Sequence, residues 1–167
     1  MMNLRLNYSA ANCSAAAALA IVGEKWTLLV LREAFFGLRR FEEMQQALGC
    51  ARNVLSDRLA KLVEHGLLER QVYQENSQRA RNEYRLTPSG IELYPVLVAL
   101  MQWGDRWLAK TGEPPVEVHH SGCEATVAVE LRCARGHGPL LARETYAVPG
   151  KGARLAVRSA SGSQRGP

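Results

Sequence analysis

Apolar residues recur at helical spacing near the start of the chain. Trp26, Leu29, Val30 and Ala34 follow the i, i+3, i+4, i+8 pattern of one helix face, and a glycine follows this stretch. An Ala-rich run ahead of it, over residues 14–22, is also followed by a glycine and predicts a shorter helix. The chain is therefore expected to begin with two helices, the second of them buried on most sides.

Two further segments with helical character follow, residues 39–48 and residues 50–65, and a glycine stands between them. In the second segment Leu55, Leu59 and Leu62 repeat at i, i+4, i+7, which is a clean amphipathic stripe. Two short helices around a glycine-containing turn, the second with a polar leading end, are the sequence pattern of a helix-turn-helix.

The spacing then changes from the helical period to the alternation of a strand. Residues 68–74 and residues 82–86 predict two antiparallel strands, and residues 75–80 form a polar turn between them. Arg79 and Arg81 give this hairpin a basic tip. Helices followed by a hairpin in this order predict a mainly α fold with a small β-wing, a winged helix-turn-helix.

A long helix is expected after the hairpin, from Thr87 and Pro88 to about Lys110, with a kink where Pro95 falls in or near its second turn. It carries more apolar surface than one small domain can cover, which predicts a dimer interface. The candidate dimerisation residues are Leu97, Leu100, Met101, Trp103 and Trp107.

The pattern predicts three parts of the chain. Residues 1–111 form the DNA-binding and dimerisation domain, and residues 112–149 form a small β-rich appendage with the character of a degenerate zinc ribbon. Residues 150–167 are rich in Gly, Ser and Arg and predict a disordered basic tail.

The polar leading end of the fourth helix is the candidate reading surface. An α-helix fits the major groove of DNA, and arginine, asparagine and serine suit guanine, adenine and phosphate respectively. The alternative is a core helix with a purely structural role and a solvated polar face, and the basic wing favours the DNA interpretation over it. The candidate DNA-binding residues are Arg39, Arg40, Arg52, Asn53, Ser56, Arg58, Lys61, Arg79 and Arg81, with Arg58 and Lys61 on the flanks as phosphate contacts.

Net charge adds little to this interpretation. Of the net charge of +5, residues 145–167 contribute four basic residues and no acidic ones, which leaves +1 for the other 144 residues. The N-terminal apolar run is too short for a membrane span and has no signal-peptide order, so a cytoplasmic protein without membrane contact is expected. In that compartment the four cysteines are expected to be thiols, sensors or ligands rather than disulfides.

Many of these residues together resemble the HxlR-type transcriptional regulators, relatives of the MarR group, over about residues 13–107. The resemblance implies a homodimer on double-stranded DNA with a palindromic operator, in which the first and last helices of this region pair across a two-fold axis. It also implies a repressor or activator, several of the family responding to electrophiles or oxidants through a cysteine placed like Cys13. The matching positions are Cys13, residues 22–31, Gly37, residues 40–44, residues 55–59, Leu62, residues 66–68, Arg70, Tyr73, Glu83, Tyr84, Leu86, Thr87 and Gly90.

Cys13 stands at or just before a predicted helix start, where the helix dipole favours a reactive thiolate. It is a candidate redox sensor, and the alternative is a small buried residue at a dimer interface. A second group of soft ligands lies in the appendage and has the two close pairs that a zinc site needs, although a metal-free remnant is the other interpretation. The candidate zinc ligands are His120, Cys123, Cys133 and His137.

No pattern typical of an enzyme occurs in the chain: a nucleophile elbow, a phosphate-cradling glycine loop, a zinc-protease helix and paired carboxylates are all missing from the sequence. We therefore expect a DNA-binding regulator, most simply a repressor, that needs no cofactor and responds to an oxidant or a small molecule. The alternative is a winged-helix module for protein–protein contact that does not read DNA.

Overall fold

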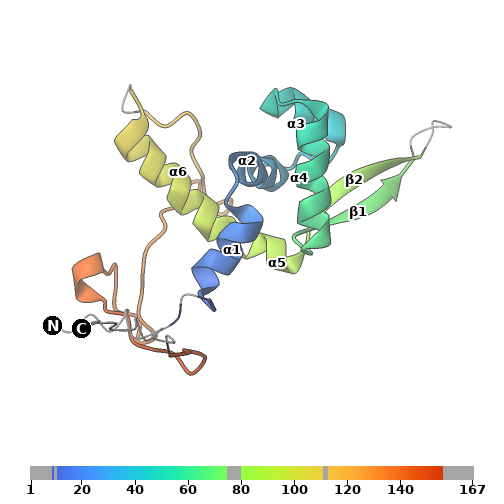
Figure 1. Cartoon of the computed structure of the whole chain (residues 1–167). Helices are drawn as coiled ribbons and strands as arrows, with labels where there is room; N and C mark the ends of the chain where they lie inside the picture. Colours follow the sequence, from blue (N-terminus) through green and yellow to red (C-terminus); the bar gives the residue numbers. More distant parts are fainter. Residues whose placement is uncertain (1–8, 10, 75–79, 111–112, 156–167) are drawn as a thin grey trace, which may run out of the picture.

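The computed structural model describes residues 9, 11–74, 80–110 and 113–155, and it places a two-stranded wing at one side of a helical body (Figure 1). The order of elements confirms the mainly helical winged helix-turn-helix expected from the sequence. The elements are α1 (Ser14–Val22), α2 (Lys25–Phe35), α3 (Phe41–Leu48), α4 (Arg52–Glu64), β1 (Leu68–Tyr73), β2 (Arg81–Leu86), α5 (Pro88–Ile91), α6 (Tyr94–Leu108) and a 3-10 helix, η2 (Ala142–Glu144).

The turn between α3 and α4 depends on Gly49. Its backbone is left-handed, with φ 62°, and its N–H donates to the carbonyl of Gln45 at 2.9 Å. A residue with a Cβ rarely adopts this conformation, whereas glycine does so without strain. The glycine therefore ends α3 and lets the chain turn into α4, as the sequence predicts.

The core lies between α2, α4 and the base of the wing. Val30, Leu55, Leu59 and Leu62 have no exposed area, and Met44 of α3 closes the same cluster. The three leucines of α4 are the stripe that the sequence predicts, and their burial fixes which face of that helix points outward. This is the feature of the fold that positions the candidate site.

The wing is the antiparallel pair of β1 and β2, with Leu68 opposite Leu86 near the body and Tyr73 opposite Arg81 toward the tip. Its outer edge is tied to the start of α3, because the N–H of Tyr84 donates to the carbonyl of Arg39 at 2.8 Å. The predicted hairpin is thus confirmed, while its turn at residues 75–79 lies outside the described residues.

The long last helix expected from the sequence is instead two helices, α5 and α6. Thr87 caps α5 as predicted, with its Oγ1 accepting from the N–H of Gly90 at 3.1 Å. Gly90 itself is needed, since a Cβ there would lie 2.1 Å from the carbonyl oxygen of Leu67. Pro95 falls in the first turn of α6, where it has no N–H that could donate back to a carbonyl of α5. The proline therefore separates two helices rather than bending one.

The β-rich appendage is a wrong prediction for the part of residues 112–149 that the structure describes. That part holds one isolated β-bridge, between His119 and Thr126, and the short helix η2, but no strand. Each of its loops is closed by two to four backbone hydrogen bonds, and none of its described residues is buried. A stable sheet needs longer pairing and a covered apolar face, and this segment has neither.

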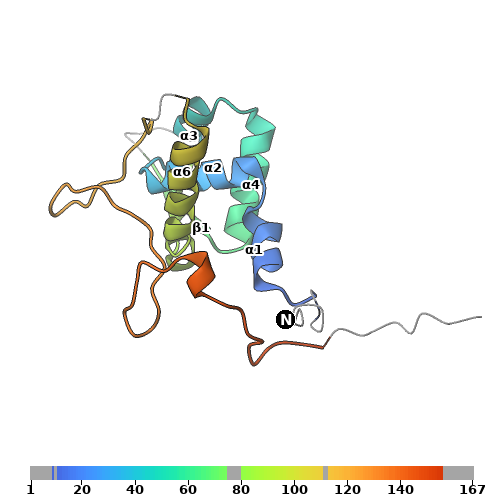
Figure 2. The same cartoon turned by 90° about the vertical axis from the view of Figure 1, so that its left-hand side faces the viewer.

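The described start of the basic tail is held against the N-terminal segment. The N–H of Ser9 donates to the carbonyl of Arg154 at 2.8 Å, and Nδ2 of Asn12 donates to the carbonyl of Gly152 at 2.6 Å. Figure 2 shows the orange C-terminal segment passing below α6 toward the N-terminus. The tail predicted as disordered is therefore placed as far as residue 155, and the rest of it lies outside the described residues.

No single helix in the described ranges has the length and apolar content to cross a membrane. Only the pair of α1 and α2, bent by 79° at their junction, meets that test of length and composition together.

Candidate nucleic-acid interface

The outward face of α4 carries two of the predicted base-contacting residues. Asn53 and Ser56 are exposed, and Ala60 continues the same face at i+7 from Asn53. Asp57 is exposed between them. Because the opposite face of the helix is buried in the core, the side chains of this face cannot turn into the interior of the protomer. The face is polar, narrow and open to a partner.

Arg52, at the first position of α4, is held by three groups of α3. Its guanidinium lies over the ring of Phe41 at 4.7 Å, its Nη1 donates to Oε1 of Gln45 at 2.8 Å, and its Nη2 is 4.0 Å from Glu42. The side chain is still 64% exposed. A guanidinium has five donors, so one hydrogen bond to glutamine leaves several for a base edge or a phosphate. The aromatic platform of Phe41 was not foreseen from the sequence.

Arg58 and Lys61, which the sequence suggests as phosphate contacts, both face Glu24. Nη1 of Arg58 is 2.5 Å from one carboxylate oxygen of Glu24, and Nζ of Lys61 is 3.4 Å from the other. Both basic side chains are about three quarters buried. The two ion pairs join the start of α2 to α4, and they hold Arg58 and Lys61 away from the exposed face of α4.

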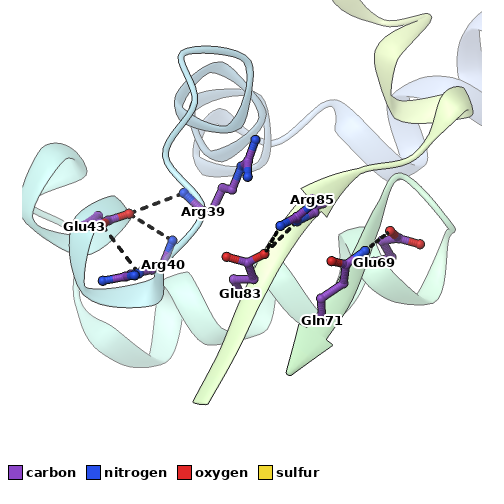
Figure 3. A network of polar contacts seen from close by, with 7 residues as sticks. All are labelled: Arg39, Arg40, Glu43, Glu69, Gln71, Glu83 and Arg85. Carbon is purple, nitrogen blue, oxygen red and sulfur yellow. Dashed lines mark hydrogen bonds and ion pairs between the residues drawn. The ribbon is translucent and has the colours of Figure 1, made fainter. Parts of the chain in front are cut away.

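The start of α3 brings Arg39 and Arg40 beside the wing, as Figure 3 shows. The guanidinium of Arg40 lies 4.6 Å over the ring of Tyr73 and 3.9 Å from the carboxylate of Glu43. The carboxylate of Glu43 also accepts hydrogen bonds from the backbone N–H groups of Arg39 and Arg40, at 3.4 Å and 3.1 Å respectively. Arg39 is exposed, and its guanidinium contacts no polar partner among the described residues. Of the two, Arg39 is the one available to a phosphate.

One face of the wing carries alternating charge. Arg85 is bound to Glu83 at 2.6 Å on β2, while Gln71 donates to Glu69 at 2.8 Å on β1 (Figure 3). Arg81 is exposed on the same face at the tip-side end of β2 and makes no polar contact with a described residue. Arg79 lies outside the described residues. The wing therefore offers Arg81, and Arg70 on its other face, as exposed cations without a polar partner among the described residues.

The five residues predicted for dimerisation lie on different faces of α6. Leu97 is 5% exposed and belongs to the protomer's own core. Met101 is partly covered by residues 114–127, with which it lines a pocket. Leu100, Trp103 and Trp107 are 50%, 54% and 68% exposed and are the large apolar side chains that remain for a partner.

Cys13 stands at the N-cap of α1 and is partly buried. Its carbonyl accepts from the N–H of Ala17 at 3.0 Å, which starts the helix. Most of α1 is apolar yet exposed, with Leu19 at 62%. The placement at a helix start agrees with the sequence, and the helix that follows has little cover within the protomer.

The four candidate zinc ligands form two separate pairs. Nδ1 of His120 is 3.2 Å from Sγ of Cys123 in one loop, whereas Cys133 donates its N–H to the carbonyl of His137 at 3.0 Å in a second loop. Within the described ranges no three His, Cys, Asp or Glu side chains gather to hold a metal ion. Each loop closes on its own backbone hydrogen bonds, so the predicted set of four is not assembled.

The known proteins to which this chain is similar agree on one family. The sequence model described as HxlR-like helix-turn-helix matches residues 21–112. An uncharacterized HTH-type transcriptional regulator of Mycobacterium tuberculosis is 44% identical over 142 residues, covering 85% of this chain and 89% of the relative.

Solved structures give the same result. The crystal structure of PA1607, a candidate transcription factor, superposes with a TM-score of 0.74 at 37% identity and covers 83% of this chain and 96% of its own. The redox regulator HypR in its oxidized form superposes with a TM-score of 0.51 at 26% identity and covers 56% of this chain and 95% of its own. The similarity to PA1607 extends beyond the helical body, whereas that to HypR covers little more than half of the chain.

Proposed function

The chain belongs to the HxlR-like helix-turn-helix family of transcriptional regulators, and on that premise we propose that it is a homodimeric repressor that binds a palindromic DNA operator. The observation that carries the proposal is the exposed polar face of α4, which the burial of Leu55, Leu59 and Leu62 directs away from the core. A helix presented in this way has the width that the major groove of B-DNA accepts.

The residues at the leading end of α4 supply the chemistry of base reading. Arg52 suits the two acceptors of guanine, Asn53 suits the donor and acceptor of adenine, and Ser56 suits either a base or a phosphate. Arg39 at the start of α3, which lies beside the wing, and Arg81 on the wing itself supply phosphate contacts next to this face. A recognition helix in the major groove with basic residues of a wing on the backbone is the docking mode of a winged helix.

The dimer is supported by the exposed stripe of α6. Val96, Leu100, Trp103 and Trp107 recur at i, i+4, i+7, i+11 and are each at least half exposed. Apolar side chains of this size on one face mark an interaction surface. A second copy covers the stripe, together with the exposed apolar α1, and brings two recognition helices to the two half-sites of a palindrome.

A thiol response at Cys13 is part of the same proposal. The helix start favours its thiolate, and HypR, to which this chain is similar, is a redox regulator. Because the proposed second copy also covers α1, modification of Cys13 alters the separation of the recognition helices and weakens operator binding. Treatment with diamide should release the wild type from its operator and leave Cys13→Ser bound. Release of the Cys13→Ser variant at the same dose would remove Cys13 from the response.

Genome-wide footprinting with the purified protein tests the function as a whole. The expected result is a limited set of protected sites that share a palindrome, with half-sites about one helical turn apart. Transcription in vitro from a bound promoter should fall as the protein is added. Binding that is uniform along the DNA, or none at moderate salt, would favour a winged-helix module that contacts another protein.

A further inference from the structure

A pocket of about 150 Å³ lies between α6 and the segment that follows it. Val98, Met101, Gln102 and Asp105, at i, i+3, i+4, i+7 on α6, form one wall. The opposite wall comes from residues 114, 116–118 and 126–127. The family model ends at residue 112, so this second wall lies outside the residues that the model matches.

Gln102 builds the pocket by fastening its two walls together. Its Nε2 donates to the carbonyl of Val127 at 2.6 Å, and its Oε1 accepts from the N–H of Val129 at 3.1 Å. The N–H of Val127 in turn donates to the carbonyl of Val118 at 2.8 Å, which closes the far wall on itself. The side chain thus pairs with the segment as a neighbouring strand would, and these hydrogen bonds fix the distance between the two walls.

The lining combines apolar side chains with negative charge. Val98, Met101 and Val127 are among its apolar residues, Asp105 and Glu117 are its carboxylates, and no basic residue is found among the described lining residues. Asp105 is half-buried and makes no hydrogen bond or ion pair with any residue that the structure describes.

Glu117 differs from Asp105 because a histidine side chain is hydrogen-bonded to it. Its Oε2 is 2.9 Å from Nε2 of His119. The pKa of His119 is raised, first by its hydrogen bond to the carbonyl of Glu124 and then by that to Glu117. Glu117 therefore already has a polar partner, whereas the carboxylate of Asp105 has none among the described residues.

We propose that this pocket binds a small organic cation, whose ammonium group pairs with Asp105 and whose apolar part lies against Val98, Met101 and Val127. A space of about 150 Å³ is the size that accommodates benzene, so the ligand carries one ring or a short branched alkyl chain. A half-buried carboxylate at the edge of an apolar space selects a cation over a neutral or anionic molecule of the same shape.

Occupancy of the pocket bears on DNA binding through α6, and this step rests on the proposed function. The helix presents Met101 and Asp105 to the pocket and Leu100 and Trp103 to solvent, where we place the second copy. A ligand that draws residues 114–127 onto the helix shifts its exposed stripe relative to the core. The spacing of the two recognition helices then changes, and operator affinity changes with it.

Calorimetric titration of the full chain without DNA tests the site independently of that step. The probes are phenethylammonium and isopentylammonium, with 2-phenylethanol and 3-phenylpropionate as neutral and anionic counterparts of the ring compound. At least one cation should bind about tenfold more tightly than either counterpart, since a charge-assisted contact to a half-buried carboxylate is worth about that factor. Asp105→Asn should lose about tenfold in affinity for that cation.

The matched control is Glu92→Gln, which removes an exposed carboxylate between α5 and α6 away from the pocket and should bind as the wild type does. Equal binding of cation, alcohol and carboxylate, an unchanged Asp105→Asn, or no binding of either cation at millimolar concentration would overturn the proposal. Operator binding measured in parallel separates the two claims, because a protein that binds the cation but no DNA retains the site and loses the proposed function.

Discussion

Between Val22 and Val98 twelve apolar side chains are buried, whereas in the described segment 113–155 no side chain is buried at all. The helical body is stabilised by its buried core. The segment is held by backbone hydrogen bonds within its short loops and by the two hydrogen bonds of Gln102. Regions of few buried apolar contacts open most readily. On the proposed function, the rigid body presents side chains to DNA, and we propose that the segment responds to small molecules.

The largest expected difference between the two regions is in stability. Leu59→Ala empties a site with no exposed area and should lower the free energy of unfolding by about 2–5 kcal/mol. Leu141→Ala, at a half-exposed position of the segment, should change it by less than about 0.5 kcal/mol. Urea unfolding of both variants is the measurement. A large loss for Leu141→Ala would mean that the segment belongs to the cooperative core.

Charge at the apolar stripe of α6 should separate the two regions by oligomeric state. Trp103→Asp places a carboxylate in the proposed interface and should give monomers or aggregates without high-affinity operator binding. Leu131→Asp puts the same group at an equally exposed position of the segment and should leave the dimer intact. Sedimentation velocity reports both. A wild type that is monomeric at micromolar concentration would refute the interface.

Base reading should depend on α4 and not on the segment. Arg52→Ala and Asn53→Ala should each weaken specific binding by about 1–3 kcal/mol and leave binding to random duplexes nearly unchanged. Arg132→Ala, which removes an exposed arginine of the segment, is the control and should alter neither. Fluorescence anisotropy with operator and random duplexes measures both affinities. Equal losses on both duplexes would show that the two residues contact only phosphate.

The smallest expected effect distinguishes free from paired cations within the body. Arg39→Ala and Arg81→Ala should each make the slope of log affinity against log salt less steep by about one unit, because each removes one phosphate contact. Lys61→Ala should leave that slope unchanged, since Lys61 faces Glu24. A reduced slope for Lys61→Ala would mean that the ion pair opens on DNA.

The sequence predicts the body well because its elements follow from local spacing. Leu55, Leu59 and Leu62 define one helix face whatever the rest of the chain does, and Gly49 ends the helix before it by its own conformation. Around Pro95 the sequence predicts one kinked helix, whereas the structure has two separate helices, α5 and α6.

What the sequence does not predict depends on contacts between distant residues. Glu24 pairs with Lys61 across 37 positions, and no local pattern shows that this cation is occupied. Gln102 binds the backbone 25 and 27 positions further on, and these two hydrogen bonds join the two walls of the pocket. In the segment Val127, Val129 and Leu131 alternate with other residues as in a strand, but the described part contains no strand, so the β-rich prediction was wrong there.

The most direct test of the central claim, a dimer that reads DNA with two copies of α4, is to change the half-site spacing. The wild type is titrated with an operator identified by footprinting and with the same operator lengthened by five base pairs at its centre. Half a helical turn puts the second half-site on the opposite face of the duplex, beyond reach of the second recognition helix. Affinity for the lengthened duplex should fall to near that for random DNA, and equal affinity for the two operators would contradict the account.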